Sequence, residues 1–299
     1  MTHYNLSEFP LWTALVTPFN DTGEVNYDDL KHLLRLQEQA QNGILILGST
    51  GEALNLDLQT RKEIIEFSCS LDLEVPIMVG VGGSLLNETI DWVRWLETQA
   101  VDSLLMVTPH YAKPGRRGQT DWFSRLLDST TKPTVLYNVP GRSATDLHLD
   151  TVRDLLPHPN FYGVKESSGS ANKFSEYIEA AEGKIMYCGD DALMPEFSSL
   201  GAQGLISVAA NAWPSATHEY VQQNLLGIFQ DKALWRGASD ALFCASNPIP
   251  VKKLLAHNQI IQSAYLQPPL HQDDLSDLSQ LLNYDAKIQN WNIKYCSAA

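Results

Sequence analysis

The sequence predicts a (β/α)8 barrel, and three observations support this fold class. Eight short apolar segments recur along the chain, and a helical pattern follows each of the first seven. The segments are almost wholly apolar rather than alternating, as expected of parallel strands that are buried on both faces. Eight such units fit within about 210 residues, which favours a closed barrel.

The expected strands are identified by their apolar composition and by the turn residues that bound them. Leu11–Val16 is stopped by Thr17 and Pro18, and Ile44–Leu47 follows Gly43. The six other expected strands have the same character: Val75–Val79, Leu104–Val107, Thr134–Tyr137, Phe161–Lys165, Lys184–Cys188 and Leu205–Val208.

The expected helices show apolar residues at helical spacing. In the first of them, Leu30, Leu33 and Leu34 lie on one face, and Asn26 is placed to cap the N-terminus. The helical patterns cover Tyr27–Ala40, Thr60–Cys69, Asn87–Gln99, Thr120–Leu127, Leu149–Leu155, Asn172–Ala181 and Leu193–Leu200.

One alternative fold class is a doubly wound open sheet. That fold normally carries a glycine fingerprint after its first strand, whereas Thr17–Phe19 stands there. From about Ser215 onward the pattern is helical only. We therefore expect a catalytic barrel over residues 1–225, including its eighth helix, and a small helical extension over residues 226–299.

Composition excludes several classes of partner. The chain has 21 Lys and Arg against 35 Asp and Glu, a formal net charge of −14, which argues against a nucleic-acid surface. The four cysteines form no CxxC pair and the eight histidines show no ligand spacing, so we expect no metal site and no disulfide framework. No signal pattern and no membrane-length apolar run is visible, so we expect a cytoplasmic protein without a membrane partner.

The sixth expected strand ends in a lysine, which is unusual for a buried segment. Phe161–Val164 is apolar and aromatic, and Lys165 is followed by small polar residues and Gly169. Burying an unpaired ammonium is costly, so a lysine held there is neutral for part of the time. A neutral amine is a nucleophile that forms a Schiff base with a carbonyl substrate. The alternative is a lysine that points into water at the strand end.

Other reactive side chains stand at the ends of expected strands, where a barrel gathers its chemistry. Ser49 and Thr50 follow the second strand, Tyr111 follows the fourth and Tyr137 closes the fifth. Together with Lys165 they could accept a carboxylate, form an imine and move protons. Each also has a purely structural interpretation, as a turn for the serine and threonine and as packing for the tyrosines.

Three further patterns are interpreted as structural. Gly189–Asp191 is expected to cap a helix rather than hold a metal ion. The glycine cluster at 80–83 lacks the Lys-Ser/Thr pair of a phosphate-binding loop. Arg116 and Arg117 are expected to form a small solvated basic pair.

Six motifs together resemble the dihydrodipicolinate synthase / N-acetylneuraminate lyase superfamily. They occur in the family's order and at about its separations, and the resemblance extends over nearly the whole chain. The resemblance implies a class I aldolase on a (β/α)8 barrel. The motifs are GSTGE at Gly48–Glu52, VTPHY at Val107–Tyr111, YNVPGR at Tyr137–Arg142, GVKESSG at Gly163–Gly169, GDD at Gly189–Asp191 and NPIPVK at Asn247–Lys252.

The resemblance also implies catalytic roles. Lys165 would form the Schiff base with pyruvate, and Tyr137 would move protons during imine formation and cyclisation. Thr50 and Tyr111 would complete the proton relay. In the family the tyrosine matching Tyr111 reaches into a neighbouring subunit, so a homo-oligomer is implied, with a tetramer of two tight dimers as the expected form. No metal or organic cofactor is implied.

Substrate-binding roles follow from the same resemblance. Ser49 and Thr50 would hold the pyruvate carboxylate, and Ile206 would line the pyruvate pocket with its backbone. Arg142 resembles the arginine with which the synthases bind the carboxylate of aspartate semialdehyde, and the sialic acid lyases usually lack it. Ser49 stands where synthases commonly have threonine, although its hydroxyl is kept.

The sequence departs from the pattern of lysine-inhibited members of the family. Leu58, Arg61 and Ser84 stand where those members tend to have histidine and asparagine ligands, and His110 replaces an aromatic residue. Only Glu88 matches. A leucine and an added positive charge disfavour a cationic ligand, so we expect weak or absent inhibition by lysine.

Three functions are compatible with these residues. The first is condensation of pyruvate with L-aspartate 4-semialdehyde to 4-hydroxy-tetrahydrodipicolinate. The second is another pyruvate-dependent aldolase, which cleaves N-acetylneuraminate or a keto-deoxy sugar acid and has no obvious need for Arg142. The third is a non-catalytic barrel that senses a keto acid, and the complete set of hydroxyls argues against it.

Overall fold

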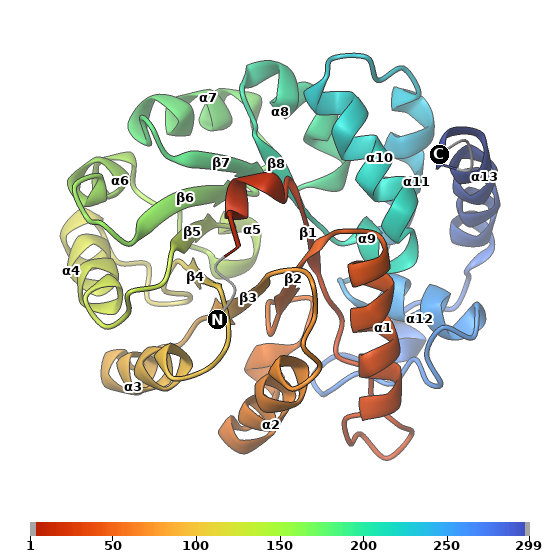
Figure 1. Ribbon diagram of the computed structural model, residues 1–299, viewed down its shortest axis with the longest axis horizontal. Coiled ribbons are helices and arrows are strands. Elements are labelled where there is room, and N and C mark those ends of the chain that lie inside the picture. Colours follow the sequence, from red (N-terminus) through yellow and green to blue (C-terminus); the bar gives the residue numbers. More distant parts are fainter. Residues whose placement is uncertain (1–3, 297–299) are drawn as a thin grey trace.

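Eight parallel strands close into a barrel in chain order, with the first strand paired to the last (Figure 1). The computed structural model describes residues 4–296. The predicted fold class is confirmed, and the open sheet is excluded because no strand lies at a free edge of this sheet. The strands are β1 (Leu11–Ala14), β2 (Gly43–Ile46), β3 (Ile77–Val81), β4 (Ser103–Val107), β5 (Thr134–Asn138), β6 (Phe161–Glu166), β7 (Ile185–Cys188) and β8 (Gly204–Ser207).

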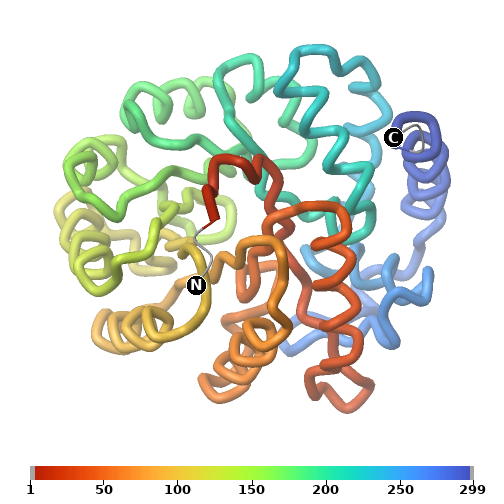
Figure 2. Tube along the Cα trace, viewed as in Figure 1, coloured from red at the N-terminus to blue at the C-terminus, as the bar shows by residue number. Residues whose placement is uncertain are grey.

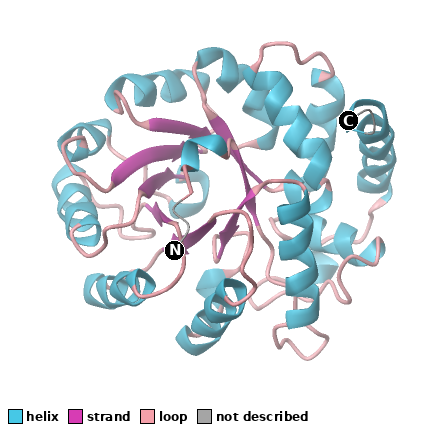
Figure 3. Cartoon of the chain, viewed as in Figure 1, coloured by secondary structure: helices cyan, strands magenta, loops and turns pink. Residues whose placement is uncertain are grey.

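The helices that follow the strands lie outside the barrel and cover it (Figure 3). The first begins as predicted, because the Asn26 side chain accepts a hydrogen bond from the Asp29 backbone at 3.1 Å. Short helices α5 (Pro140–Ser143) and α9 (Ala209–Ala212) were not predicted. The covering helices are α1 (Tyr27–Gln39), α2 (Leu58–Cys69), α3 (Leu86–Glu97), α4 (Arg116–Leu127), α6 (Leu149–Leu155), α7 (Ala171–Ala180), α8 (Met194–Leu200) and α10 (Pro214–Leu225).

Two apolar layers hold this arrangement together. Side chains that point into the barrel, such as Trp12, Met78 and Ile206, form one buried cluster. Side chains on the outer faces of the strands pack against the helices in a second and larger cluster. Since both faces of each strand are buried, the strands read as continuous apolar runs, which is the pattern from which the sequence predicted them.

Three helices follow the barrel, namely α11 (Lys232–Leu242), α12 (Ile249–His257) and α13 (Ser279–Cys296). Helix α13 lies beside α10 and α11 at the outside of the molecule (Figures 1 and 2). The Trp213 indole donates a hydrogen bond of 2.6 Å to Asp285, which joins α13 to the barrel. The division of the chain at residue 225 stays a prediction. Within residues 4–296, no helix is both long enough and apolar enough to span a membrane.

Two expected boundaries were wrong for identifiable reasons. The third strand begins and ends two residues later than predicted, because Gly80 was interpreted as a turn residue but lies inside β3. A Cβ atom there would stand 2.2 Å from the Leu47 carbonyl oxygen, so the glycine permits a close approach of two strands. Helix α4 starts at Arg116 rather than Thr120, and Arg116 pairs with Asp154 instead of being simply solvated.

Candidate active site

A cavity of about 720 Å³ opens at the carboxyl ends of the strands. Active sites of (β/α)8 barrels lie at this end of the strands. Gly141 and Gly189 leave parts of its wall free of side chains. Six residues that the sequence singled out line the cavity together, namely Ser49, Thr50, Tyr137, Arg142, Lys165 and Ile206.

Lys165 lies at the centre of this wall and is only 5% exposed. Its β6 position pairs directly with Tyr137 of β5, so both side chains point into the barrel mouth. The amine Nζ stands 4.3 Å from the centroid of the Tyr137 ring. Among residues 4–296 no carboxylate lies within ion-pair distance of this amine. The alternative, a lysine that points into water, is therefore wrong.

A second buried lysine has the opposite environment. Lys252 is 0% exposed, and its Nζ donates a hydrogen bond of 2.8 Å to Glu52, while the Phe19 ring lies 4.2 Å away. The other oxygen of Glu52 accepts a hydrogen bond from the Gln267 backbone at 2.7 Å. Burial lowers the pKa of Lys252 to about 8 and raises the pKa of Glu52, because desolvation outweighs the attraction within the pair.

The turn after β2 is fixed to a distant part of the chain. Thr50 is buried, and its hydroxyl accepts a hydrogen bond of 2.9 Å from the Asn247 side chain. The guanidinium of Arg142 donates to the Asn247 carbonyl at 3.1 Å. Ser49 and Arg142 are exposed at the cavity rim. Asn247 therefore links two of the predicted binding residues, and its place in the NPIPVK motif is the signal that could have found it.

Tyr111 does not join the cavity of its own chain. Its side chain is 91% exposed and it is absent from the cavity wall. The residue has a left-handed backbone, with φ of 68°, and its N–H donates to the Ser143 carbonyl at 3.1 Å. The hydrogen bonds that would link Thr50, Tyr137 and Tyr111 in a relay are not formed within residues 4–296.

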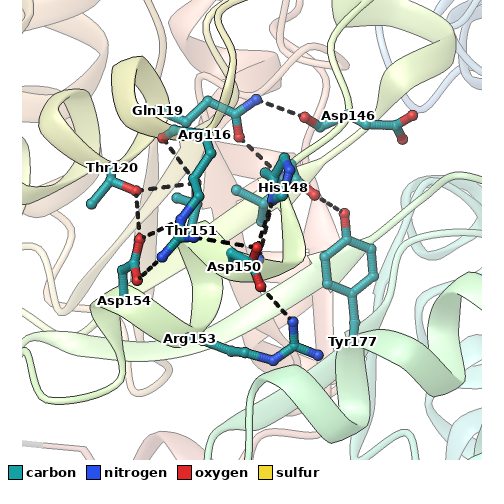
Figure 4. Close-up of polar contacts among 11 residues, drawn as sticks. Arg116, Gln119, Thr120, Asp146, His148, Asp150, Thr151, Arg153, Asp154 and Tyr177 are labelled. Carbon is teal, nitrogen blue, oxygen red and sulfur yellow. Dashed lines mark hydrogen bonds and ion pairs between the residues drawn. The ribbon is translucent and has the colours of Figure 1, made fainter.

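Helix α4, which follows the loop that carries Tyr111, makes polar contacts with α6 and with the segment before α6 (Figure 4). The Gln119 side chain donates to the carbonyl oxygens of Pro114 and Asp146 at 2.9 and 2.8 Å. Arg116 forms an ion pair of 2.6 Å with Asp154. These contacts fix the C-terminal end of the loop against α4 and α6. Tyr111 therefore points outward from a loop that is held in place.

The buried carboxylates near the site have structural partners. Asp190 accepts from the Ala192 backbone at 3.0 Å, so the predicted capping role is confirmed. Asp191 accepts from the Ser207 hydroxyl and the Val208 backbone, and burial raises its pKa to about 6. No group of three or more His, Cys, Asp or Glu side chains is arranged to hold a metal ion in the described part of the chain.

A second cavity of about 520 Å³ lies beside the first. His110 borders both cavities, and its Nε2 is 3.1 Å from the Ser84 hydroxyl. The Arg61 guanidinium stacks over the Trp92 ring at 5.3 Å. The residues in which the sequence departs from lysine-inhibited members all line this cavity, together with Glu88: Leu58, Arg61, Ser84 and His110.

A closed barrel with an unpaired buried lysine at its mouth defines a class of protein, the Schiff-base aldolases of the (β/α)8 fold. Within that class the chain belongs to the Dihydrodipicolinate synthetase family, which matches residues 10–284. The chain is 44% identical over 283 residues to a 4-hydroxy-tetrahydrodipicolinate synthase of Francisella tularensis subsp. novicida, covering 94% of this chain and 96% of that protein.

Solved structures give the same result. The structure of the 4-hydroxy-tetrahydrodipicolinate synthase from Methylacidiphilum fumariolicum SolV superposes with a TM-score of 0.89 at 29% identity, covering 97% of this chain and 98% of that one. A structure described as the first monomeric dihydrodipicolinate synthase variant superposes with a TM-score of 0.88 at 26% identity, over 94% and 97% of the two chains.

Proposed function

We propose that this chain condenses pyruvate with L-aspartate 4-semialdehyde to give 4-hydroxy-tetrahydrodipicolinate, a step of lysine and diaminopimelate biosynthesis. The main observation behind the proposal is that the amine of Lys165 is buried beside the Tyr137 ring without a carboxylate partner among residues 4–296. Family membership and the synthase names of its relatives support the substrates. None of the relatives described above is a sugar-acid lyase, so that alternative is not favoured.

The chemistry runs through Lys165. Its neutral amine attacks the ketone carbon of pyruvate, water leaves, and a protonated imine forms. The imine draws electrons from the methyl carbon, which loses a proton and becomes the enamine carbon. This carbon bonds to the aldehyde carbon of the second substrate. The amine of that substrate then attacks the imine carbon, displaces Lys165 and closes the ring. The imine supplies the electron sink, so the proposed reaction requires no cofactor.

The remaining side chains bind and move protons in this proposal. Ser49 and Thr50 hold the pyruvate carboxylate at the β2 turn, and Ile206 forms the apolar floor. The phenol of Tyr137 transfers protons at the ketone oxygen, because Tyr137 lines the cavity and its ring lies 4.3 Å from the amine. The planar guanidinium of Arg142, at the cavity rim, binds the carboxylate of aspartate semialdehyde with two hydrogen bonds.

We further propose that the active unit is a homo-oligomer in the cytoplasm, with a tetramer of two dimers as the expected form. Tyr111 supports this, because its anchored and exposed phenol can reach a second copy but lies outside its own cavity. Leu54, Leu58 and Leu85 are exposed around the second cavity on the same side of the barrel mouth, which adds apolar area for contact between copies.

We also propose that inhibition by lysine is weak or absent, and the residues that line the second cavity support this. A ligand in that cavity would lie close to Arg61, which lines it. The positive charge of Arg61 would repel the ammonium group of lysine. Leu58 gives a ligand no polar contact. A steady-state assay with increasing lysine is expected to show no loss of rate at micromolar concentrations. Inhibition in that range would contradict the proposal.

The test of the function is a comparison of substrates. The purified chain is assayed for condensation of pyruvate with aspartate semialdehyde, and for cleavage of N-acetylneuraminate and keto-deoxy sugar acids. Condensation with a kcat/KM in the ordinary enzyme range, roughly 10⁴ M⁻¹s⁻¹ or more, and no sugar-acid cleavage is the expected result. Cleavage of a sugar acid without condensation would reject the synthase.

A further inference from the structure

Several hydroxyls line the cavity without an assigned role, and that of Ser167 is the one that lies beside the reactive lysine. Ser167 follows β6 and stands two residues after Lys165, so the two side chains point to the same side, while Glu166 between them points away to Asn138. The Oγ atom of Ser167 is buried, lines the cavity, and has no hydrogen-bond partner within residues 4–296. Buried hydroxyls are normally hydrogen-bonded, so this orphan donor requires an explanation.

Gly189 shows how close this hydroxyl lies to the reactive lysine. A Cβ atom built on Gly189 would stand 1.9 Å from Ser167 Oγ and 2.7 Å from Lys165 Cε. Both atoms therefore border the small space that the glycine leaves open, on the β7 side of the amine. Tyr137 lies on the β5 side. The lysine is thus flanked by the Tyr137 ring on one side and by the Ser167 hydroxyl on the other.

The Ser167 hydroxyl can be matched to one substrate atom, and this step rests on the proposed function. Ser49 and Thr50 account for the pyruvate carboxylate, Tyr137 for the ketone oxygen, and Arg142 for the second carboxylate. The aldehyde oxygen is left without a donor. Negative charge develops on that oxygen when the new carbon–carbon bond forms, and a desolvated donor without another partner stabilises such charge strongly.

We propose that Ser167 Oγ donates a hydrogen bond to the aldehyde oxygen during the condensation step. The enamine pair forms the carbon–carbon bond, the carbonyl π pair moves to the aldehyde oxygen, and the lysine nitrogen returns to the protonated imine. The oxygen then takes the proton that the methyl carbon gave up earlier and becomes the 4-hydroxyl group. Ser167 keeps its own proton throughout, so the step needs no further reactant.

The experiment separates the two halves of the reaction. Exchange of the methyl protons of pyruvate for deuterium in D2O, without aldehyde, reports the imine and enamine steps alone. Condensation with aspartate semialdehyde reports the step assigned to Ser167. For Ser167→Ala we expect exchange within about twofold of the unmodified chain and a condensation kcat lower by about 10- to 100-fold. Ser167→Thr, which keeps a hydroxyl, should recover part of that loss.

Ser168→Ala is the matched control, because the Ser168 hydroxyl accepts a hydrogen bond from the Ser170 backbone at 3.3 Å and lies outside the cavity wall. It should leave both rates unchanged. The exchange rate of the Ser167→Ala variant also reports how much of the protein has a folded active site. Misfolding would lower exchange and condensation together, and so could not produce the expected result. Equal losses of exchange and condensation, or no loss of either, would overturn the assignment. An unmodified chain that catalyses no exchange would instead reject the proposed function, and the role of Ser167 with it.

Discussion

Lys165 and Lys252 are both buried, but among residues 4–296 only Lys252 has a carboxylate partner. Leaving an ammonium buried and unpaired is costly, whereas a paired one is tolerated. The sequence could predict Lys165, since a lysine that closes an apolar strand is visible in the local pattern. It could not predict the Glu52–Lys252 pair, because the partners are 200 residues apart and meet only after the barrel closes.

Gly189 gives a prediction at the scale of one residue. In Gly189→Ala, the new methyl group would overlap Ser167 Oγ and press against Lys165 Cε, at 1.9 and 2.7 Å. Displacing the amine by a fraction of an ångström should lower kcat/KM for pyruvate by about 10- to 100-fold. Gly141→Ala is the control, because nothing lies within 4 Å of a Cβ at this cavity glycine. Steady-state kinetics of both variants check this, and equal activities would contradict it.

The turn after β2 and the segment that begins α12 act as one unit. Thr50 is joined to Asn247, and Glu52 is joined to Lys252. Most elements of the barrel could be predicted within two residues from apolar runs and helical spacing. Strand β3 is shifted by two residues because Gly80 was interpreted as a turn residue, a role that the closed barrel overrides, and helix α4 begins at Arg116 rather than at the predicted Thr120. Hydrogen bonds between distant loops leave no local signal.

The ion pair predicts a pH dependence of stability. The pKa of Lys252 is about 8 in the fold and about 10.5 when unfolded, so the unfolded state binds more protons between these values. The contribution of Lys252 to the free energy of unfolding should therefore rise from pH 8 to pH 10.5 and be lost as pH falls through 8. Denaturant unfolding of the natural chain and of the double variant Glu52→Gln/Lys252→Met, which cannot titrate there, measures it.

Two further outcomes belong to this pair. The single variant Lys252→Met leaves Glu52 buried without its partner, and should lose about 3–5 kcal/mol of stability at pH 7. The double variant should lose less, since no unpaired charge remains. A difference between the natural chain and the double variant that stays flat from pH 8 to 10.5 would contradict the lowered pKa.

The whole molecule presents Tyr111 to its surroundings rather than to its own cavity. The sequence alone could place this tyrosine after β4, but it could not show that the side chain points outward. That direction depends on the left-handed backbone of Tyr111 and on the contacts of Gln119 and Arg116 with α6 and the loop before it. Our proposal that a second copy completes the site rests on this arrangement.

Mixing two inactive variants tests that arrangement. Tyr111→Phe and Lys165→Ala should each lose at least about 100-fold in kcat. If Tyr111 serves the site of its partner, a mixed dimer contains one intact site, so co-expression should restore activity at about one quarter of all sites. Full activity of Tyr111→Phe alone, or no recovery in the mixture, would show that Tyr111 does not cross between copies.

Covalent trapping on Lys165 tests the central claim most directly. The chain is incubated with pyruvate, reduced with borohydride, digested, and its peptides are weighed by mass spectrometry, with a sample lacking pyruvate beside it. The account predicts one added carboxyethyl group, located on Lys165, with Lys252 unmodified because its amine is paired with Glu52. Absence of the adduct, or an adduct on another lysine, would contradict it.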